Sequence, residues 1–189
     1  MAGINATFPT ITIDLVLDRQ TIKDVLSGIL HSILFHRLFG LIKPQIFEVL
    51  DVTMPGVSDP EMEQLVYEKV ESFWRAIQAD VSRRGQIMVT FSEKRPKKSW
   101  YQLYSADEDV SWEQWIINVE FRQHRTERER LTFNTSLANA LSKSVQTILI
   151  HTSSERGRAA VPPITQSSGI SPFPFKITAR VGGAEVGSS

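Results

Sequence analysis

The chain of 189 residues contains no cysteine. Disulfide frameworks, thiolate zinc sites and cysteine nucleophiles are therefore excluded. This absence suits a reducing compartment, and we expect a cytoplasmic protein. The sequence also lacks a run of roughly eighteen apolar residues, so we predict no transmembrane segment. Residues 1–9 have neither the charged region nor the apolar region of a secretory signal.

An excess charge of either sign is absent too. Lys and Arg total 21, Asp and Glu total 21, and the pI is about 6.9. Because nucleic-acid binders usually carry a marked basic excess, we expect no nucleic-acid partner. Hydrophobic residues make up 41% of the chain and charged residues 22%, close to the averages of globular proteins. We therefore expect one globular domain rather than a disordered chain or a rod.

Sequence motifs that carry catalysis or hold a cofactor are missing, among them the nucleotide-binding glycine loops, the nucleophile elbow and H-E-x-x-H. His31 and His36 would lie about 140° apart on a helix, too far around it to chelate one metal ion. The acidic run at 107–109 is interpreted as a solvated loop, because a general acid needs a carboxyl group in an apolar pocket. We predict that the protein is not an enzyme and has no catalytic residues, cofactor or metal site.

The spacing of apolar residues predicts the order of the elements. Residues 46–53 are rich in β-forming residues and are interpreted as a strand with a less clear pattern. Apolar residues alternate in four further segments typical of strands, at 11–17, 87–91, 115–121 and 173–181. They recur every three or four residues in three segments typical of helices, with inner stripes spanning 22–34, 65–81 and 131–149. This order predicts an α+β fold, with three long helices packed on a mainly antiparallel sheet.

Composition also predicts where the domain begins and ends. Proline, glycine and serine gather outside the periodic segments, as is typical of loops and tails. The predicted boundaries are an N-terminal tail at 1–9, a domain at 10–181 with a long hairpin loop at 93–111 and a Pro/Ser-rich loop at 152–171, and a flexible Gly/Ser tail at 182–189.

The back of the third predicted helix is poor in charge. Solvent-facing helices usually carry Lys, Glu and Arg, whereas the cores of interfaces are depleted in charge. Two interpretations remain open: a solvated, serine-rich helix and a surface that binds a protein partner. The candidate interface residues are Thr135, Asn139, Ser142, Lys143 and Gln146, beside Ser136 and Thr147.

Trp100 and Tyr101 follow a basic run at 94–98 inside the predicted hairpin loop. Large aromatic side chains in a charged loop either fold back on the core or stand out as a binding anchor. Both interpretations stay open, and we keep Trp100 and Tyr101 as a candidate exposed aromatic loop. Trp112 and Trp115 lie three residues apart in a predicted strand, so we expect Trp115 in the core and Trp112 on the opposite face.

Four segments resemble one known family. Residues 29–37 read ILHSILFHR, residues 110–119 read VSWEQWIINV, and the closing segments PIT at 163–165 and PFPFKI at 172–177 complete the pattern. Together they resemble the autophagy-related protein 101 family from about residue 10 to residue 179. The L-H-x-x-L-x-H-R helix together with the W-E-x-W strand makes the resemblance specific.

The resemblance implies a HORMA domain that is not an enzyme. Members of this family pair with the HORMA domain of autophagy-related protein 13 and stabilise it in the complex of the autophagy-initiating Ser/Thr kinase. Recruitment to the phagophore assembly site is implied as well. HORMA domains of this type meet through the third helix, so the resemblance and the charge-poor face point to the same surface.

Residues 99–104 depart from the animal pattern. Animal members carry W-P-F in the hairpin loop as a finger that recruits downstream factors, whereas this chain reads SWYQLY. The departure and the short C-terminus indicate a fungal-type member. The competing hypothesis is a peptide-capturing HORMA adaptor of the chromosome-axis or checkpoint type, with the last strand as a belt over an added peptide strand. Residues 152–189 are short and Gly/Ser-ended for such a belt.

Overall fold

The computed structural model describes residues 8–97, 107–165 and 169–187. Its main sheet has five strands in the order β1-β5-β4-β6-β7. β1 pairs with β5 in parallel, and every other pair in this sheet is antiparallel. The bounds are β1 Thr10–Leu17, β4 Arg84–Pro96, β5 Asp107–Phe121, β6 Phe175–Val181 and β7 Ala184–Val186.

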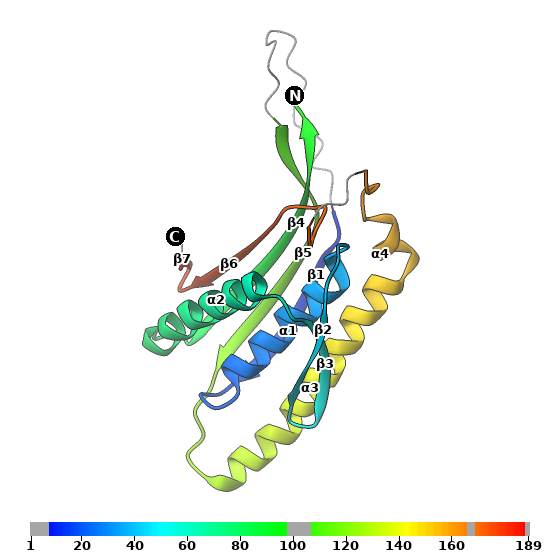
Figure 1. Ribbon diagram of the computed structural model, residues 1–189. Coiled ribbons are helices and arrows are strands. Elements are labelled where there is room, and N and C mark those ends of the chain that lie inside the picture. The colour runs from blue at the N-terminus through cyan, green and yellow to red at the C-terminus, as the bar shows by residue number, and fades with distance from the viewer. Residues whose placement is uncertain (1–7, 98–106, 166–168, 188–189) are drawn as a thin grey trace.

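The helices gather on one face of this sheet (Figure 1). α1 lies between α2, which packs toward β6 and β7, and α3, which packs toward β1. The bounds are α1 Ile22–Arg37, α2 Pro60–Ala79, α3 Glu127–Ser153 and the short α4 Glu155–Ala159. The α+β class and the three long helices expected from the sequence are confirmed, on a sheet that is mixed but mostly antiparallel.

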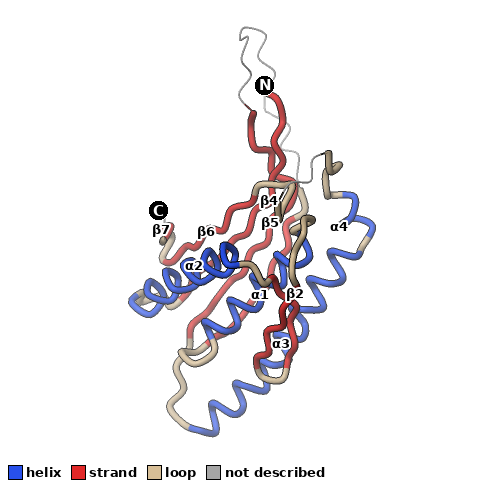
Figure 2. The backbone as a smooth tube through the Cα atoms, viewed as in Figure 1, coloured by secondary structure: helices blue, strands red, loops and turns tan. Residues whose placement is uncertain are grey.

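α1 is the central helix of the core. Most of its residues are buried, from Ile22 near its start to Arg37 at its end. A separate hairpin packs against it, formed by β2 (Pro44–Val49) and β3 (Val52–Val57) (Figure 2). The approach is close, since a Cβ on Gly28 would lie 2.5 Å from Met54 Cε. Surrounded in this way, α1 is buried on nearly all sides rather than along one stripe.

The β2–β3 hairpin replaces the single strand predicted at 46–53. Leu50 and Asp51 both have positive φ angles, of 50° and 61°. Two central residues with positive φ are typical of the tight turn that joins antiparallel strands. Leu-Asp is not one of the glycine-containing pairs that usually mark this turn, so the sequence pattern did not reveal it.

The predicted hairpin loop at 93–111 is strand at both of its described ends. β4 continues to Pro96 and β5 begins at Asp107, and the register places Lys94 opposite Asp109 and Arg95 opposite Glu108. Opposite charges facing each other across a strand pair stabilise it. The basic run and the acidic run therefore face each other in one extended hairpin. The acidic side chains are exposed to solvent, as expected, but they lie on a strand rather than in a loop.

Three other expectations need correction. Gly182 and Gly183, both with positive φ, turn the chain into β7, so the predicted flexible tail contains a strand paired with β6. The predicted loop at 152–171 begins with the last turn of α3 and then α4. Val81, placed in the stripe of the second helix, is fully exposed because α2 ends at Ala79.

Candidate protein interface

α3 packs on the core through few side chains. Its buried residues are Leu137, Leu141, Ser144 and Ile148, although the helix is 27 residues long. All five interface residues predicted from the sequence are exposed: Thr135, Asn139, Ser142, Lys143 and Gln146. The structure thus brings the predicted residues together on the outward side of one helix.

Exposed apolar side chains extend this outward side at both ends. Leu131 is 59% exposed, Leu149 53% and Ile150 66%. This is a correction, because the apolar spacing predicted Leu131 and Leu149 in the inner stripe. With spacings of three and four residues, one continuous face is formed. We call it the α3 face and define it as Leu131, Thr135, Asn139, Ser142, Lys143, Gln146, Leu149, Ile150 and Ser153.

The α3 face is nearly free of charge. Lys143 is the only Lys, Arg, Asp or Glu between Leu131 and Ser153. Two of its three hydroxyl groups also donate back into the helix: Thr135 to the Leu131 carbonyl at 3.2 Å and Ser153 to the Leu149 carbonyl at 2.6 Å. A donor that is already bonded loses little when water is removed. The face can therefore be covered by a partner at low desolvation cost.

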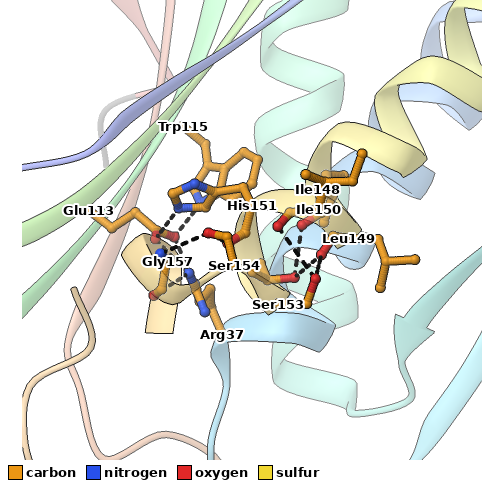
Figure 3. A network of polar contacts seen from close by, with 11 residues as sticks. Arg37, Glu113, Trp115, Ile148, Leu149, Ile150, His151, Ser153, Ser154 and Gly157 are labelled. Atoms are coloured by element: carbon orange, nitrogen blue, oxygen red, sulfur yellow. Dashed lines mark hydrogen bonds and ion pairs between the residues drawn. The ribbon is translucent and has the colours of Figure 1, made fainter. Parts of the chain in front are cut away.

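A buried charged cluster anchors the C-terminal end of α3 (Figure 3). The Arg37 Nε and Nη2 atoms each donate to one oxygen of Glu113 at 2.7 Å. Trp115 Nε1 donates to Glu113 Oε1 at 2.6 Å, and His151 Nε2 lies 2.9 Å from Glu113 Oε2. Arg37 Nη2 also donates to the Gly157 carbonyl at 3.1 Å. The cluster joins α1, β5, α3 and α4.

A β-bulge in β5 directs the neighbouring side chains of Trp112 and Glu113 toward this cluster. Phe91 pairs with Glu113 and Ser92 with Ser111, which leaves Trp112 between them without a partner on β4. Trp112 and Glu113 are consequently both buried, although neighbouring residues of a regular strand point to opposite faces. The prediction that Trp115 lies in the core is confirmed, and the prediction that Trp112 lies opposite to it is wrong.

Arg37, Glu113 and His151 were not found from the sequence, although a signal was present. Glu113 is in phase with Trp115, Ile117 and Val119, so strand alternation alone places its carboxylate on the core face. A buried carboxylate needs a buried cation, and Arg37 ends the most apolar helix of the chain. Glu113 is 0% exposed and Arg37 2%, so the cluster is shielded from substrates and acts by holding α3 in place.

The remaining candidate residues lie apart from this cluster. His31 is buried and stacks on Phe47 at 4.6 Å, and burial lowers its pKa. The pKa of His36 is also lowered, first by burial and then by the neighbouring Arg37 cation. Trp100 and Tyr101 lie outside the described residues. Within the described ranges, no group of three His, Asp or Glu side chains could hold a metal ion.

The comparisons with known proteins decide the family. A family model described as "Autophagy-related protein 101" matches residues 14–168. The chain belongs to the autophagy-related protein 101 family. Its fold is therefore the HORMA domain that the resemblance implied, and the family consists of non-catalytic adaptors. No helix in the described part of the chain is long and apolar enough to cross a membrane.

Individual relatives are similar over most of their length. The fission yeast Schizosaccharomyces pombe protein "Autophagy-related protein 101" is 27% identical over 164 residues, covering 87% of this chain and 84% of the relative. The Arabidopsis thaliana protein of the same name is 29% identical over 184 residues, covering 87% and 83%. The Xenopus laevis protein is 23% identical over 153 residues, covering 72% and 68%. The plant relative is slightly more identical than the fungal one, 29% against 27%, so a fungal-type member stays a prediction.

Proposed function

We propose that this autophagy-related factor heterodimerises with the HORMA domain of autophagy-related protein 13 and stabilises it in the autophagy-initiation kinase complex. The observation that carries this proposal is the α3 face, which is exposed, nearly uncharged and apolar at both ends. Such a face is typical of the core of a protein interface rather than of a helix that stays in water. The autophagy-initiating kinase is then an indirect partner.

The adaptor acts by thermodynamic linkage. A protein that binds only the folded form of its partner shifts the unfolding equilibrium of that partner. At a concentration about 100 times the dissociation constant, the stabilisation is about 2.7 kcal/mol. This mechanism needs a preformed surface but no reacting groups. The Glu113 cluster supports such a surface, because His151 of α3 contacts the same carboxylate that binds Arg37 of α1.

The proposed place of action is the cytoplasm, with recruitment to the phagophore assembly site through the kinase complex. Neither location requires a membrane-spanning helix in this chain. Recruitment then depends on the partner, so a variant with an altered α3 face should lose its localisation while remaining folded. Fluorescently tagged wild-type and Asn139→Arg chains, compared in starved cells, measure this directly.

The decisive experiment is co-purification of the full chain with the HORMA domain of autophagy-related protein 13 from the same organism. Light scattering should give the mass of a one-to-one complex, and the partner should melt at a higher temperature in the complex than alone. A chain that stays monomeric and does not bind this partner would contradict the proposal. That outcome would favour the peptide-capturing alternative, in which a peptide is added as a strand to a sheet edge.

A further inference from the structure

A small cleft opens beside the C-terminal end of the α3 face. It has a volume of about 350 Å³ and lies where the ends of α1 and α3 meet α4. Phe39, Leu149 and Val161 supply its apolar walls, and Thr152 and Ser153 lie at its side. Phe39 is 37% exposed and Leu149 53%, so apolar surface remains accessible to solvent at this place.

The cleft is continuous with the α3 face. Leu149 and Ser153 belong to both, and the Leu149 side chain points away from the buried Glu113 cluster (Figure 3). The neighbouring Ile150 is 66% exposed. A partner that covers the α3 face therefore passes over the mouth of the cleft at its C-terminal end.

The charged side chains that line the cleft are both cations, Arg37 and Arg158. His36 also lines it, and no Asp or Glu does. Arg37 is already paired within the protein, because its guanidinium group donates to both carboxylate oxygens of Glu113 and to the Gly157 carbonyl. Arg158 is exposed, and no described carboxylate lies within 4 Å of its guanidinium group. The cleft thus offers apolar walls and one cation available for pairing.

We propose that this cleft receives a large apolar side chain of the partner, and that a carboxylate next to that side chain in the partner pairs with Arg158. An anchor residue in a pocket, accompanied by a bidentate Arg–carboxylate pair, is an arrangement that concentrates binding energy. The inference rests on the proposed function, since the occupant belongs to the protein that covers the α3 face. It adds the chemistry by which the end of α3 recognises that protein.

The test compares two arginines of the same short helix. Arg156 is exposed on α4 like Arg158 but does not line the cleft. Titration calorimetry of the HORMA domain of autophagy-related protein 13 into the full chain should show at least tenfold weaker binding for Arg158→Glu and at most a twofold change for Arg156→Glu. The affinity of the wild type should also fall more steeply with rising salt concentration than the affinity of Arg158→Gln, because the variant lacks the exposed ion pair that salt screens.

A second variant probes the apolar half of the cleft. Ser153→Trp fills the cleft from the side of α3 and should weaken binding at least tenfold, while the melting temperature stays near that of the wild type. Asn139→Arg, in the middle of the α3 face, separates the two proposals. If the wild type does not bind the partner, the proposed function fails. If Asn139→Arg abolishes binding while Arg158→Glu and Ser153→Trp bind like the wild type, only the cleft proposal is overturned.

Discussion

α2 and α3 flank the same central helix but differ in what they present to solvent. α2 buries an apolar stripe that includes Phe73 and Trp74, and its other side carries a mixture of acidic and basic residues. Those charged residues are Glu61, Glu63, Glu68, Lys69 and Arg75, whereas Glu71 pairs with Lys23 of α1. α3 has a single Lys over its last 23 residues and leaves three large apolar side chains exposed. The outward side of α2 is therefore typical of a helix exposed to water, whereas the outward side of α3 is typical of a helix covered by a protein partner.

The two helices also differ in how they are held. α2 is fixed by apolar packing, with Phe73 fully buried and Trp74 packed edge-on against Phe121 at 5.4 Å. The end of α3 is fixed by the ion pair and hydrogen bonds of Glu113. A buried pair of charges is costly to desolvate but demands one geometry. An interface helix that contributes few apolar side chains to the core is thereby kept in a defined position.

The largest effect should follow from removing the anchor of α3. Glu113→Ala leaves the Arg37 cation buried without a carboxylate, and we expect a loss of about 3–5 kcal/mol in the free energy of unfolding. Phe73→Ala on the α2 side should cost about as much, through a cavity instead. Urea unfolding measures both losses, and hydrogen exchange distinguishes them. Faster exchange should appear at residues 148–157 in Glu113→Ala and within α2 in Phe73→Ala. A loss below about 1 kcal/mol for Glu113→Ala would contradict the anchoring role.

The next effect concerns the outward sides of the two helices. Asn139→Arg places a second cation in the middle of the α3 face and should weaken partner binding at least tenfold, about 1.4 kcal/mol. Gln64→Arg adds the same charge to the exposed side of α2 and should change affinity less than twofold. Ser142→Glu, of opposite charge, tests whether burial rather than charge sign is decisive. Equal losses of partner affinity for Gln64→Arg and Asn139→Arg would contradict the proposed difference between the two helices.

The class of fold was predictable because it depends on the periodic spacing of apolar residues along the chain. Alternation and helical spacing are local properties of the sequence, and they placed the three long helices and the strands at 11–17, 87–91, 115–121 and 173–181. The Leu50–Asp51 turn was missed because positive φ is usual for glycine and asparagine but not for leucine. The extension of β4 and β5 was missed because it depends on charges that face each other across the hairpin, which only the register shows.

The candidate surface was only partly predictable. Its polar residues could be recognised from their lack of charge. Leu131 and Leu149 were assigned to the core, because periodicity does not show which apolar residues of a wide stripe pack against another element. Arg37 and Glu113 are 76 residues apart in sequence, and no local pattern pairs them. The segments at 29–37 and 110–119, which carry the resemblance, contain Arg37 and Glu113, so these two segments meet in the buried cluster.

A smaller effect concerns the starts of the two helices. The Asp59 side chain accepts from the Glu61 and Met62 amides at the start of α2, and Thr126 Oγ1 accepts from the Glu129 amide at the start of α3. Replacing either residue by Ala should cost about 1 kcal/mol. Asp59→Ala should cost more, because it removes a second amide contact and a negative charge near the positive end of the helix dipole. Thermal unfolding of both variants, with Asp59→Asn as the neutral control, gives the order. A larger loss for Thr126→Ala would contradict it.

The smallest expected effect is the loss of stability at lower pH that arises from His31, on the side of the core next to α2. His31 of α1 lies near Glu63 of α2, yet burial outweighs this carboxylate and lowers the pKa of His31 below its ordinary value of 6.5. Between the lowered pKa and 6.5 the unfolded chain binds more protons than the folded chain, so stability falls as pH falls through this window. His31→Gln cannot take up the proton and should flatten the decline in the free energy of unfolding between pH 7.5 and 5.5. His36→Gln should flatten it as well, because the pKa of His36 is lowered too. Urea titrations across this range measure the slopes, and a His31→Gln slope equal to that of the wild type would show that His31 is protonated equally in both states.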